Sequence, residues 1–298
     1  MQLYTPVALP PDIISLDIDS KVMMLGSCFA ENVGERLKIC MGSDGVDVNP
    51  FGVLYNPASI AQALQIMMDR ESIHAITDGR FIFHGQDGVW HSWLHSSRFS
   101  DNTQEGCIEK TVSRLVTAQK MLREATLLCV TFGTTRHYVH DGIVVANCHK
   151  EPQRCFTEKE QTLDELTALW EKIISELREF NPGLNICFTV SPYRYKKYGF
   201  HESQIQKAKL LLLCDHLCHE SSATKESGGK VAYFPSYEIL LDELRDYRFY
   251  KEDMLHPSGQ AVDIIAERFM DWSFSPRLME ESVRRQKEHR LSQHRKLL

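Results

Sequence analysis

The sequence has no long uninterrupted apolar run. Of its 298 residues 43% are hydrophobic, but no segment approaches the roughly 18 consecutive apolar residues that a membrane-spanning helix needs. The first twenty residues also lack the basic stretch and the apolar core of a secretory signal peptide. We therefore expect a cytoplasmic protein that has no membrane partner.

Patterns that bind phosphates or nucleic acids are missing as well. Neither G-x-G-x-x-G nor G-x-x-x-x-G-K-[ST] occurs, so the sequence offers no glycine-rich loop for a nucleotide and predicts no cofactor. The 34 basic and 40 acidic residues leave a formal net charge of -6, and the body of the chain carries no basic stripe with interleaved aromatic residues. This charge pattern disfavours a nucleic-acid partner.

The nine cysteines do not form a disulfide pattern. They are odd in number and scattered, mostly in apolar contexts such as LLCVTF and NICFTV, which favours reduced core thiols in a cytoplasmic protein. Cys214, His216, Cys218 and His219 could hold zinc. No partner pair with ligand spacing is evident, however, and the run LLLLCDHLC is apolar. We expect core cysteines there and no metal site.

What the chain does contain is an alternation of strand-like and helix-like segments. Short apolar strands are expected at 21–25, 126–132, 185–191 and 230–234. Helical patterns are expected at 28–39, 56–68, 107–125, 162–180, 202–220 and 258–271. Strands that alternate with helices imply a parallel sheet covered on both faces. The fold class predicted is therefore α/β.

Short motifs place several turns and helix ends. Thr162 and Glu165 form a capping box that starts a helix, and the Asn-Pro-Gly at 181–183 ends it. The aromatic segment 79–95, with Gln-Asp-Gly at its centre, predicts a β-hairpin. Asp-Gly at 141–142 predicts a second hairpin.

The same patterns suggest how the chain is divided. We interpret residues 1–275 as a single α/β domain with β-hairpin insertions. The segment 221–230 is small and polar and predicts a loop. Residues 276–298 are charged and basic, which favours a solvated helical or frayed tail; a role at a partner or anionic surface is the alternative.

Ser27 stands at the junction of a strand and a helix. The apolar run from Val22 ends at Gly26, and a helical pattern starts at Phe29. A hydroxyl at such a turn lies where free backbone N–H groups and the positive helix end converge, and these would stabilise an oxyanion. Ser27 is therefore either a nucleophile or a helix N-cap.

Asp253 and His256 supply the partners that a nucleophilic serine needs. Residues three apart in a turn can approach, so the carboxylate can accept the imidazole N–H and leave the other ring nitrogen to take the serine proton. Serine with a histidine oriented by aspartate is the minimum set for acyl transfer. Cys28 is the rival nucleophile, but we expect it to point to a different side of the helix start as a structural thiol.

Other polar positions are more ambiguous. Gly52 offers a backbone N–H as an oxyanion donor, whereas the neighbouring Asn56 is expected to cap a helix. The residues 133–135 follow a central strand, where ligands of open parallel sheets collect, or they form a simple turn. Asn-Cys-His-Lys at 147–150 is either part of a site or an exposed loop.

These segments together resemble the GSCFA domain family, a group within the SGNH (GDSL-like) hydrolase superfamily. Residues 26–30 spell the family name. The resemblance covers roughly residues 20–272. It continues in order through NPFGVLYNP (49–57), VANCHK (145–150), FTVSPYR (188–194), YFPSYEILLDELRDYRFY (233–250) and DMLHPSGQAVDII (253–265).

The resemblance implies a three-layer α/β/α sandwich on a five-stranded parallel sheet, flavodoxin-like in outline. Superfamily members are mostly esterases, lipases, carbohydrate deacetylases and acyltransferases of bacterial type. Carried over, Ser27 is the nucleophile, His256 the general base and Asp253 its orienting partner. The oxyanion donors are the backbone N–H groups of Ser27 and Gly52.

One departure from the superfamily concerns the third oxyanion donor. Members usually place an asparagine in a G-x-N-D segment after the third strand, but the matching stretch here is Gly-Thr-Thr-Arg at 133–136. The absence of one donor can cost about 10²–10³ in rate; Thr135, Asn147 or His149 could substitute. The residues expected to bind substrate are Asn56, Arg136, Asn147, His149, Lys150 and Arg194.

Three functional hypotheses follow. The first is a serine esterase or deacetylase that cleaves a small acyl ester, with a small-molecule or carbohydrate ester as its partner. The second is acyl transfer to a sugar or polymer acceptor, for which the aromatic hairpin with Trp90, His91 and Trp93 would form a lid, unless these side chains are core. The third is a binding module without turnover, which the missing asparagine motivates.

Overall fold

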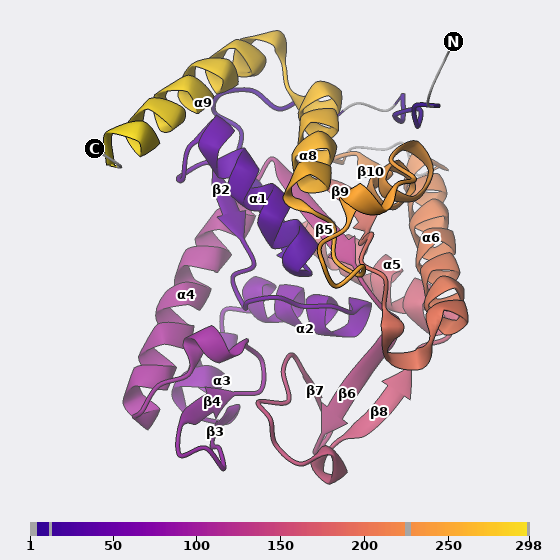
Figure 1. Cartoon of the computed structure of the whole chain (residues 1–298). Helices are drawn as coiled ribbons and strands as arrows, with labels where there is room; N and C mark the ends of the chain where they lie inside the picture. Colours follow the sequence, from indigo (N-terminus) through magenta and orange to yellow (C-terminus); the bar gives the residue numbers. More distant parts are fainter. Residues whose placement is uncertain (1–4, 12–13, 224–227, 297–298) are drawn as a thin grey trace.

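A five-stranded parallel sheet forms the centre of the molecule (Figure 1). The computed structural model describes residues 5–11, 14–223 and 228–296. The strand order is β10-β9-β5-β1-β2, and every neighbouring pair is parallel. This is the order of flavodoxin-like sheets, so the predicted α/β fold is confirmed. The strands are β1 (Val22–Gly26), β2 (Val46–Val48), β5 (Leu127–Phe132), β9 (Asn185–Val190) and β10 (Val231–Tyr233).

Helices cover both faces of the sheet and complete three layers. In β5, Leu128 and Val130 point to one face and Leu127 and Cys129 to the other, and all four are buried. A strand buried on both sides is apolar throughout, which explains the run LLCVTF. One face carries α2 (Pro57–Met68), α4 (Gln104–Glu124), α5 (Leu163–Phe180) and α6 (Phe200–Ala223). The other face carries α1 (Cys28–Met41) and α8 (Gly259–Ser273).

Two antiparallel insertions lie beside this core, and both predicted hairpins are confirmed. Asp141 and Gly142 have φ of 46° and 79°, as a two-residue hairpin turn requires. The sequence did not predict the third strand of the second insertion, because Thr-Glu-Lys-Glu shows no apolar alternation. The strands are β3 (Ile82–His84) with β4 (Trp90–Ser92), and β6 (Arg136–His140) with β7 (Ile143–Val145) and β8 (Thr157–Glu160).

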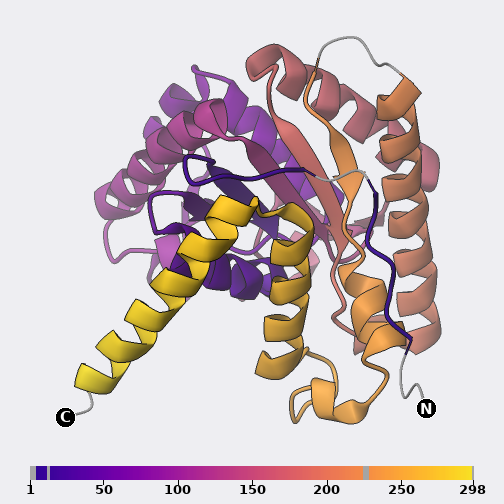
Figure 2. The same ribbon diagram turned by 90° about the horizontal axis from the view of Figure 1, so that it is seen from above.

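The basic tail forms helix α9 (Pro276–Lys296), which runs outward from the body of the molecule in both views (Figures 1 and 2). Its first half packs on α1: Leu278 is buried, and Gln286 donates to Cys40 Sγ at 3.3 Å. Of the predicted loop 221–230, the first three residues belong to α6, and residues 224–227 lie outside the described residues.

Short helical segments complete the structure. No helix within the described ranges is long and apolar enough to cross a membrane. The segments are α3 (Ser72–Thr77), α7 (Ser236–Glu238), a π-helical turn (Ile239–Glu243) and the 3₁₀ turns Ser97–Phe99, Gln153–Cys155, Lys196–Tyr198 and Tyr247–Phe249.

Gly26 ends β1 in a position that excludes a side chain. Its φ is 144°, and a Cβ there would lie 2.5 Å from the carbonyl oxygen of Thr131 on β5. We expect Gly26→Ala to lower the free energy of unfolding by roughly 3 kcal/mol, measured by urea denaturation. Gly142→Ala is the control, because Gly142 has positive φ but open space around it, and it should lose about 1 kcal/mol. Equal losses would argue against crowding at Gly26.

Candidate active site

The turn from β1 to α1 fixes the position of Ser27. The N–H of Gly26 donates to Asn49 Oδ1 at 2.9 Å, and Ser27 is the N-cap of α1, where its Oγ accepts the N–H of Phe29 at 3.2 Å. The same hydroxyl donates to Ser191 Oγ at 3.3 Å. Ser27 is thus a helix cap and also presents its oxygen to a polar neighbour beyond the strand ends.

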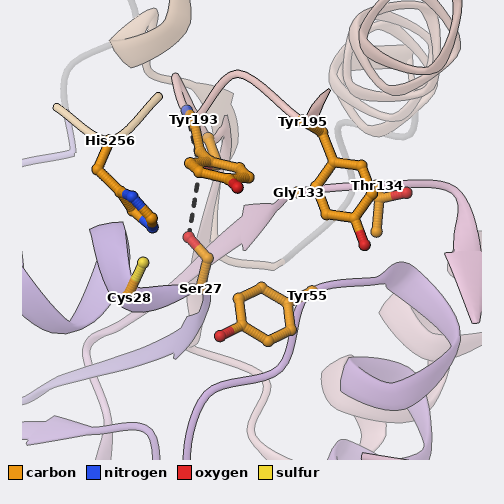
Figure 3. Close-up of a pocket in the computed structure, with 9 residues that line it drawn as sticks. Ser27, Cys28, Tyr55, Gly133, Thr134, Tyr193, Tyr195 and His256 are labelled. Atoms are coloured by element: carbon orange, nitrogen blue, oxygen red, sulfur yellow. Dashed lines mark hydrogen bonds between the residues drawn. The ribbon is translucent and has the colours of Figure 1, made fainter. Parts of the chain in front are cut away.

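A cavity of about 230 Å³ opens over Ser27 (Figure 3). It lies where β1, β5 and β9 end, because Ser27, Gly133 and Ser191 come directly or almost directly after these strands. The carboxyl edge of a parallel sheet is where ligands bind in open α/β folds. The residues that line the cavity are Ser27, Cys28, Tyr55, Gly133, Thr134, Ser191, Tyr193, Tyr195 and His256.

His256 reaches this cavity from a tight loop that Asp253 organises. The Asp253 carboxylate accepts the N–H of His256 at 3.0 Å, the ring Nδ1–H of the same residue, and the N–H of Leu255 at 2.9 Å. These hydrogen bonds hold the pKa of Asp253 well below its usual range. The carboxylate therefore stays ionised and fixes the Nδ1–H tautomer, which leaves Nε2 free for a proton.

Two residues after β9 hold that loop in place. Arg194 donates from Nη1 to the carbonyl of Met254 at 3.0 Å, and its N–H donates to the carbonyl of Leu255 at 3.1 Å. The ring of Tyr193 lies against His256, with centroids 4.4 Å apart. Arg194, expected to bind substrate, lies outside the residues that line the cavity and instead supports the loop that carries the histidine.

Cys28 lines the same cavity as Ser27, so the expectation that it points elsewhere is wrong. Figure 3 shows its sulfur on the His256 side of Ser27. Burial raises the pKa of the Cys28 thiol. A protonated thiol is a poor nucleophile. The raised pKa therefore disfavours Cys28 as the nucleophile, although its position in the cavity would allow that role.

The expected oxyanion donors other than Ser27 do not face the cavity. The N–H of Gly52 donates to the carbonyl of Asn49 at 2.8 Å within its own turn, so it is not available as a donor. Thr135 is fully buried outside the cavity. Asn147 turns back on its own loop, where its Oδ1 accepts the N–H of His149 at 2.7 Å.

The expected substrate-binding residues also have other contacts. Asn56 caps α2 by accepting the N–H of Ser59 at 2.8 Å, as the simpler interpretation predicted. Arg136 pairs with Glu202 and Glu160. Lys150 is exposed in the loop after β7. Together with Asn147 and His149, these residues lie outside the cavity lining.

His149 belongs to an aromatic cluster between the two insertions. Its ring stacks on His91 with centroids 4.5 Å apart, and its Nε2 bonds to the carbonyl of Ser92 at 2.9 Å. Burial lowers the pKa of His149 to about 4. Trp93 and His91 are buried, and Trp93 stacks on Phe83, so the core interpretation is supported for these two side chains. Trp90 is only partly buried.

Several cavity residues were not identified from the sequence. Tyr55, Ser191, Tyr193 and Tyr195 carried no catalytic motif. The sequence could have indicated Ser191, Tyr193 and Tyr195, because they follow the buried strand β9. Ligands bind at strand ends in this kind of sheet.

Lys207 on α6 was also not identified from the sequence. It binds the backbone of two residues that line the cavity. It is 2% exposed, and its Nζ donates to the carbonyls of Gly133 at 2.8 Å and Ser191 at 2.6 Å. Burial lowers the pKa of Lys207 to about 7.

The buried lysine predicts a specific dependence of stability on pH. The pKa of lysine is 10.5 in an unfolded chain and about 7 for Lys207 in the fold, so between these values the unfolded chain binds a proton that the native state lacks. Stability then rises with pH in this window. We expect the difference in unfolding free energy between wild type and Lys207→Met to change by up to about 1.4 kcal/mol per pH unit from pH 7 to 10. Urea denaturation at several pH values measures it.

Lys209→Met is the matched control on the same helix. Lys209 pairs with Glu160 and is partly exposed, so its removal should leave the pH slope unchanged. Parallel pH curves for wild type and Lys207→Met would show that Lys207 keeps its ordinary pKa.

Comparison with known proteins gives a similar solved structure and the family of the chain. No curated protein matches the chain. Among solved structures, a carbohydrate esterase family 3 protein from Talaromyces cellulolyticus is similar over 84% of this chain and 93% of its own, with a TM-score of 0.40 and 9% identity. The model of the GSCFA family matches residues 21–269. Because this match spans most of the sequence, the chain belongs to the GSCFA family.

Proposed function

We propose that this protein is an SGNH-type serine esterase that removes a small acyl group from an alcohol of carbohydrate type. The observation that carries the proposal is the cavity at the carboxyl edge of the sheet. Ser27 and His256 both line it, and Asp253 holds the far side of the His256 ring. A hydroxyl, an imidazole and an orienting carboxylate are the groups that acyl transfer needs.

The reaction has two halves. Ser27 Oγ attacks the ester carbonyl while His256 Nε2 takes its proton, and the oxyanion forms at the start of α1, near the N–H of Ser27. His256 then returns the proton to the departing alcohol, which leaves an acyl group on Ser27. Water, deprotonated by His256, releases the acid and restores the serine. The bond from Ser27 to Ser191 is exchanged for one to His256 when substrate binds.

The size and lining of the cavity support a small acyl group. About 230 Å³ is below the usual range for drug-sized ligands. The rings of Tyr55, Tyr193 and Tyr195 give it apolar walls with hydroxyl edges (Figure 3). Such walls suit an acetyl group and one face of a sugar ring. The burial of Trp93 weakens the lid argument for acyl transfer to another acceptor.

Hydrolysis of p-nitrophenyl acetate by the purified protein tests the proposal. We expect nitrophenol release with free acetate as the second product. Acetylated acceptor formed faster than acetate, in a panel of sugars and glycerol, would favour the transferase instead. No turnover with retained ligand binding would favour the binding module.

A further inference from the structure

Several backbone N–H groups near Ser27 already have hydrogen-bond partners and do not serve as oxyanion donors. Beside Gly52, the N–H groups of Gly133 and Thr134 are also engaged, since both donate to the carbonyl of Tyr55, at 2.9 and 3.0 Å. The start of α1 therefore remains as the backbone source of donors near Ser27. A side chain that lines the cavity can supply a further donor.

Tyr55 presents a hydroxyl at the right side of this cavity. Tyr55 lines the same cavity as Ser27 and Cys28, and Figure 3 shows its ring below Ser27 with the hydroxyl at the end of the ring on the Cys28 side. Burial raises the pKa of Tyr55 to about 12, and the charges of Cys28 and Glu31 in the first turn of α1 add to this shift. The phenol therefore keeps its proton across the working pH range.

The Tyr55 hydroxyl is free, and its backbone is fixed. Among the described residues, no hydrogen-bond partner takes this hydroxyl, and the residue is 43% exposed. The carbonyl of Tyr55 accepts two N–H groups from the turn after β5, and Lys207 binds the carbonyl of Gly133 in that turn. A hydrogen-bond donor whose backbone is held in this way needs little reorganisation when negative charge develops on the substrate oxygen.

We propose that the Tyr55 hydroxyl is an oxyanion donor, acting together with the backbone N–H at the start of α1. Tyr55 keeps its proton throughout, so it donates a hydrogen bond to the tetrahedral oxyanion and transfers nothing. This inference rests on the proposed function, because it needs Ser27 to form that intermediate.

Tyr55→Phe tests the inference, because it removes one oxygen and keeps the ring. We expect kcat for p-nitrophenyl acetate to fall about 10²-fold, with KM changed less than threefold. Phenylboronic acid, which forms an anionic tetrahedral adduct with a serine nucleophile, should inhibit the variant more weakly by a similar factor. Tyr247→Phe is the matched control, since Tyr247 is 65% exposed and outside the cavity, and it should behave as wild type.

The outcomes separate the two proposals. An active wild type with an equally active Tyr55→Phe variant would overturn the role of Tyr55 and leave the esterase standing. A lower kcat with unchanged boronate inhibition would assign Tyr55 a structural role and also overturn it. A wild type that neither hydrolyses the ester nor binds phenylboronic acid would overturn both proposals.

Discussion

Ser27→Ala should lower kcat for p-nitrophenyl acetate by a factor on the order of 10⁶. The substitution removes the oxygen that attacks the carbonyl, and no acyl intermediate can then form. His256 without its serine has no proton to move, so the rest of the site cannot compensate. The measurement is nitrophenol release at saturating substrate, compared with wild type and with a buffer blank.

Two controls separate chemistry from folding in this experiment. Ser27 also caps α1, so its loss costs about 1 kcal/mol of stability. Thr162→Ala removes an equivalent cap from α5 and should cost a similar amount without lowering kcat. Cys28→Ala should lower kcat less than tenfold. If Ser27→Ala retained activity and Cys28→Ala lost it, the cysteine would be the nucleophile.

His256→Ala should cost about as much as the serine variant, on the order of 10⁶ in kcat. His256 takes the serine proton and returns it to the leaving alcohol, so both halves of the reaction depend on its ring. Asp253→Asn should cost less, about 10⁴, because the ring remains but its tautomer is no longer fixed. The same nitrophenol assay measures both variants.

The histidine experiment has its own control and contrary result. His216 is partly exposed on α6, binds Glu171 through Nε2 at 2.7 Å and lies outside the cavity lining, so His216→Ala should keep full activity. Added imidazole should restore part of the activity of His256→Ala. Equal activity of His256→Ala and wild type would remove the general base from the mechanism.

The central fold could be predicted because its strands carry a strong local signal. A parallel strand buried on both faces needs a continuous apolar run, and LLCVTF and NICFTV provide it. The Asp141-Gly142 turn was equally clear, since few other pairs accept its backbone angles. β8 escaped prediction because its pairing with β6 depends on backbone hydrogen bonds and not on apolar side chains.

The sequence could predict those site residues whose position follows from the topology of the sheet. It could not predict those whose role depends on local backbone hydrogen bonds or on the direction of one side chain. Ser27 and His256 are distant in sequence, yet the end of β1 and the loop before α8 bring them to one cavity. Gly52 was misjudged because its N–H closes a local turn with Asn49, which no side-chain pattern reveals. Tyr55 was overlooked because its role depends on the direction of one hydroxyl in three dimensions.

Labelling with a fluorophosphonate, followed by mass mapping of the modified peptide, tests the central claim most directly. The reagent reacts with an activated serine and thus reports nucleophile identity and competence together. The account predicts one adduct, on Ser27, which is lost in Ser27→Ala and forms much more slowly in His256→Ala. An adduct on Cys28, or no adduct on a folded protein, would contradict it.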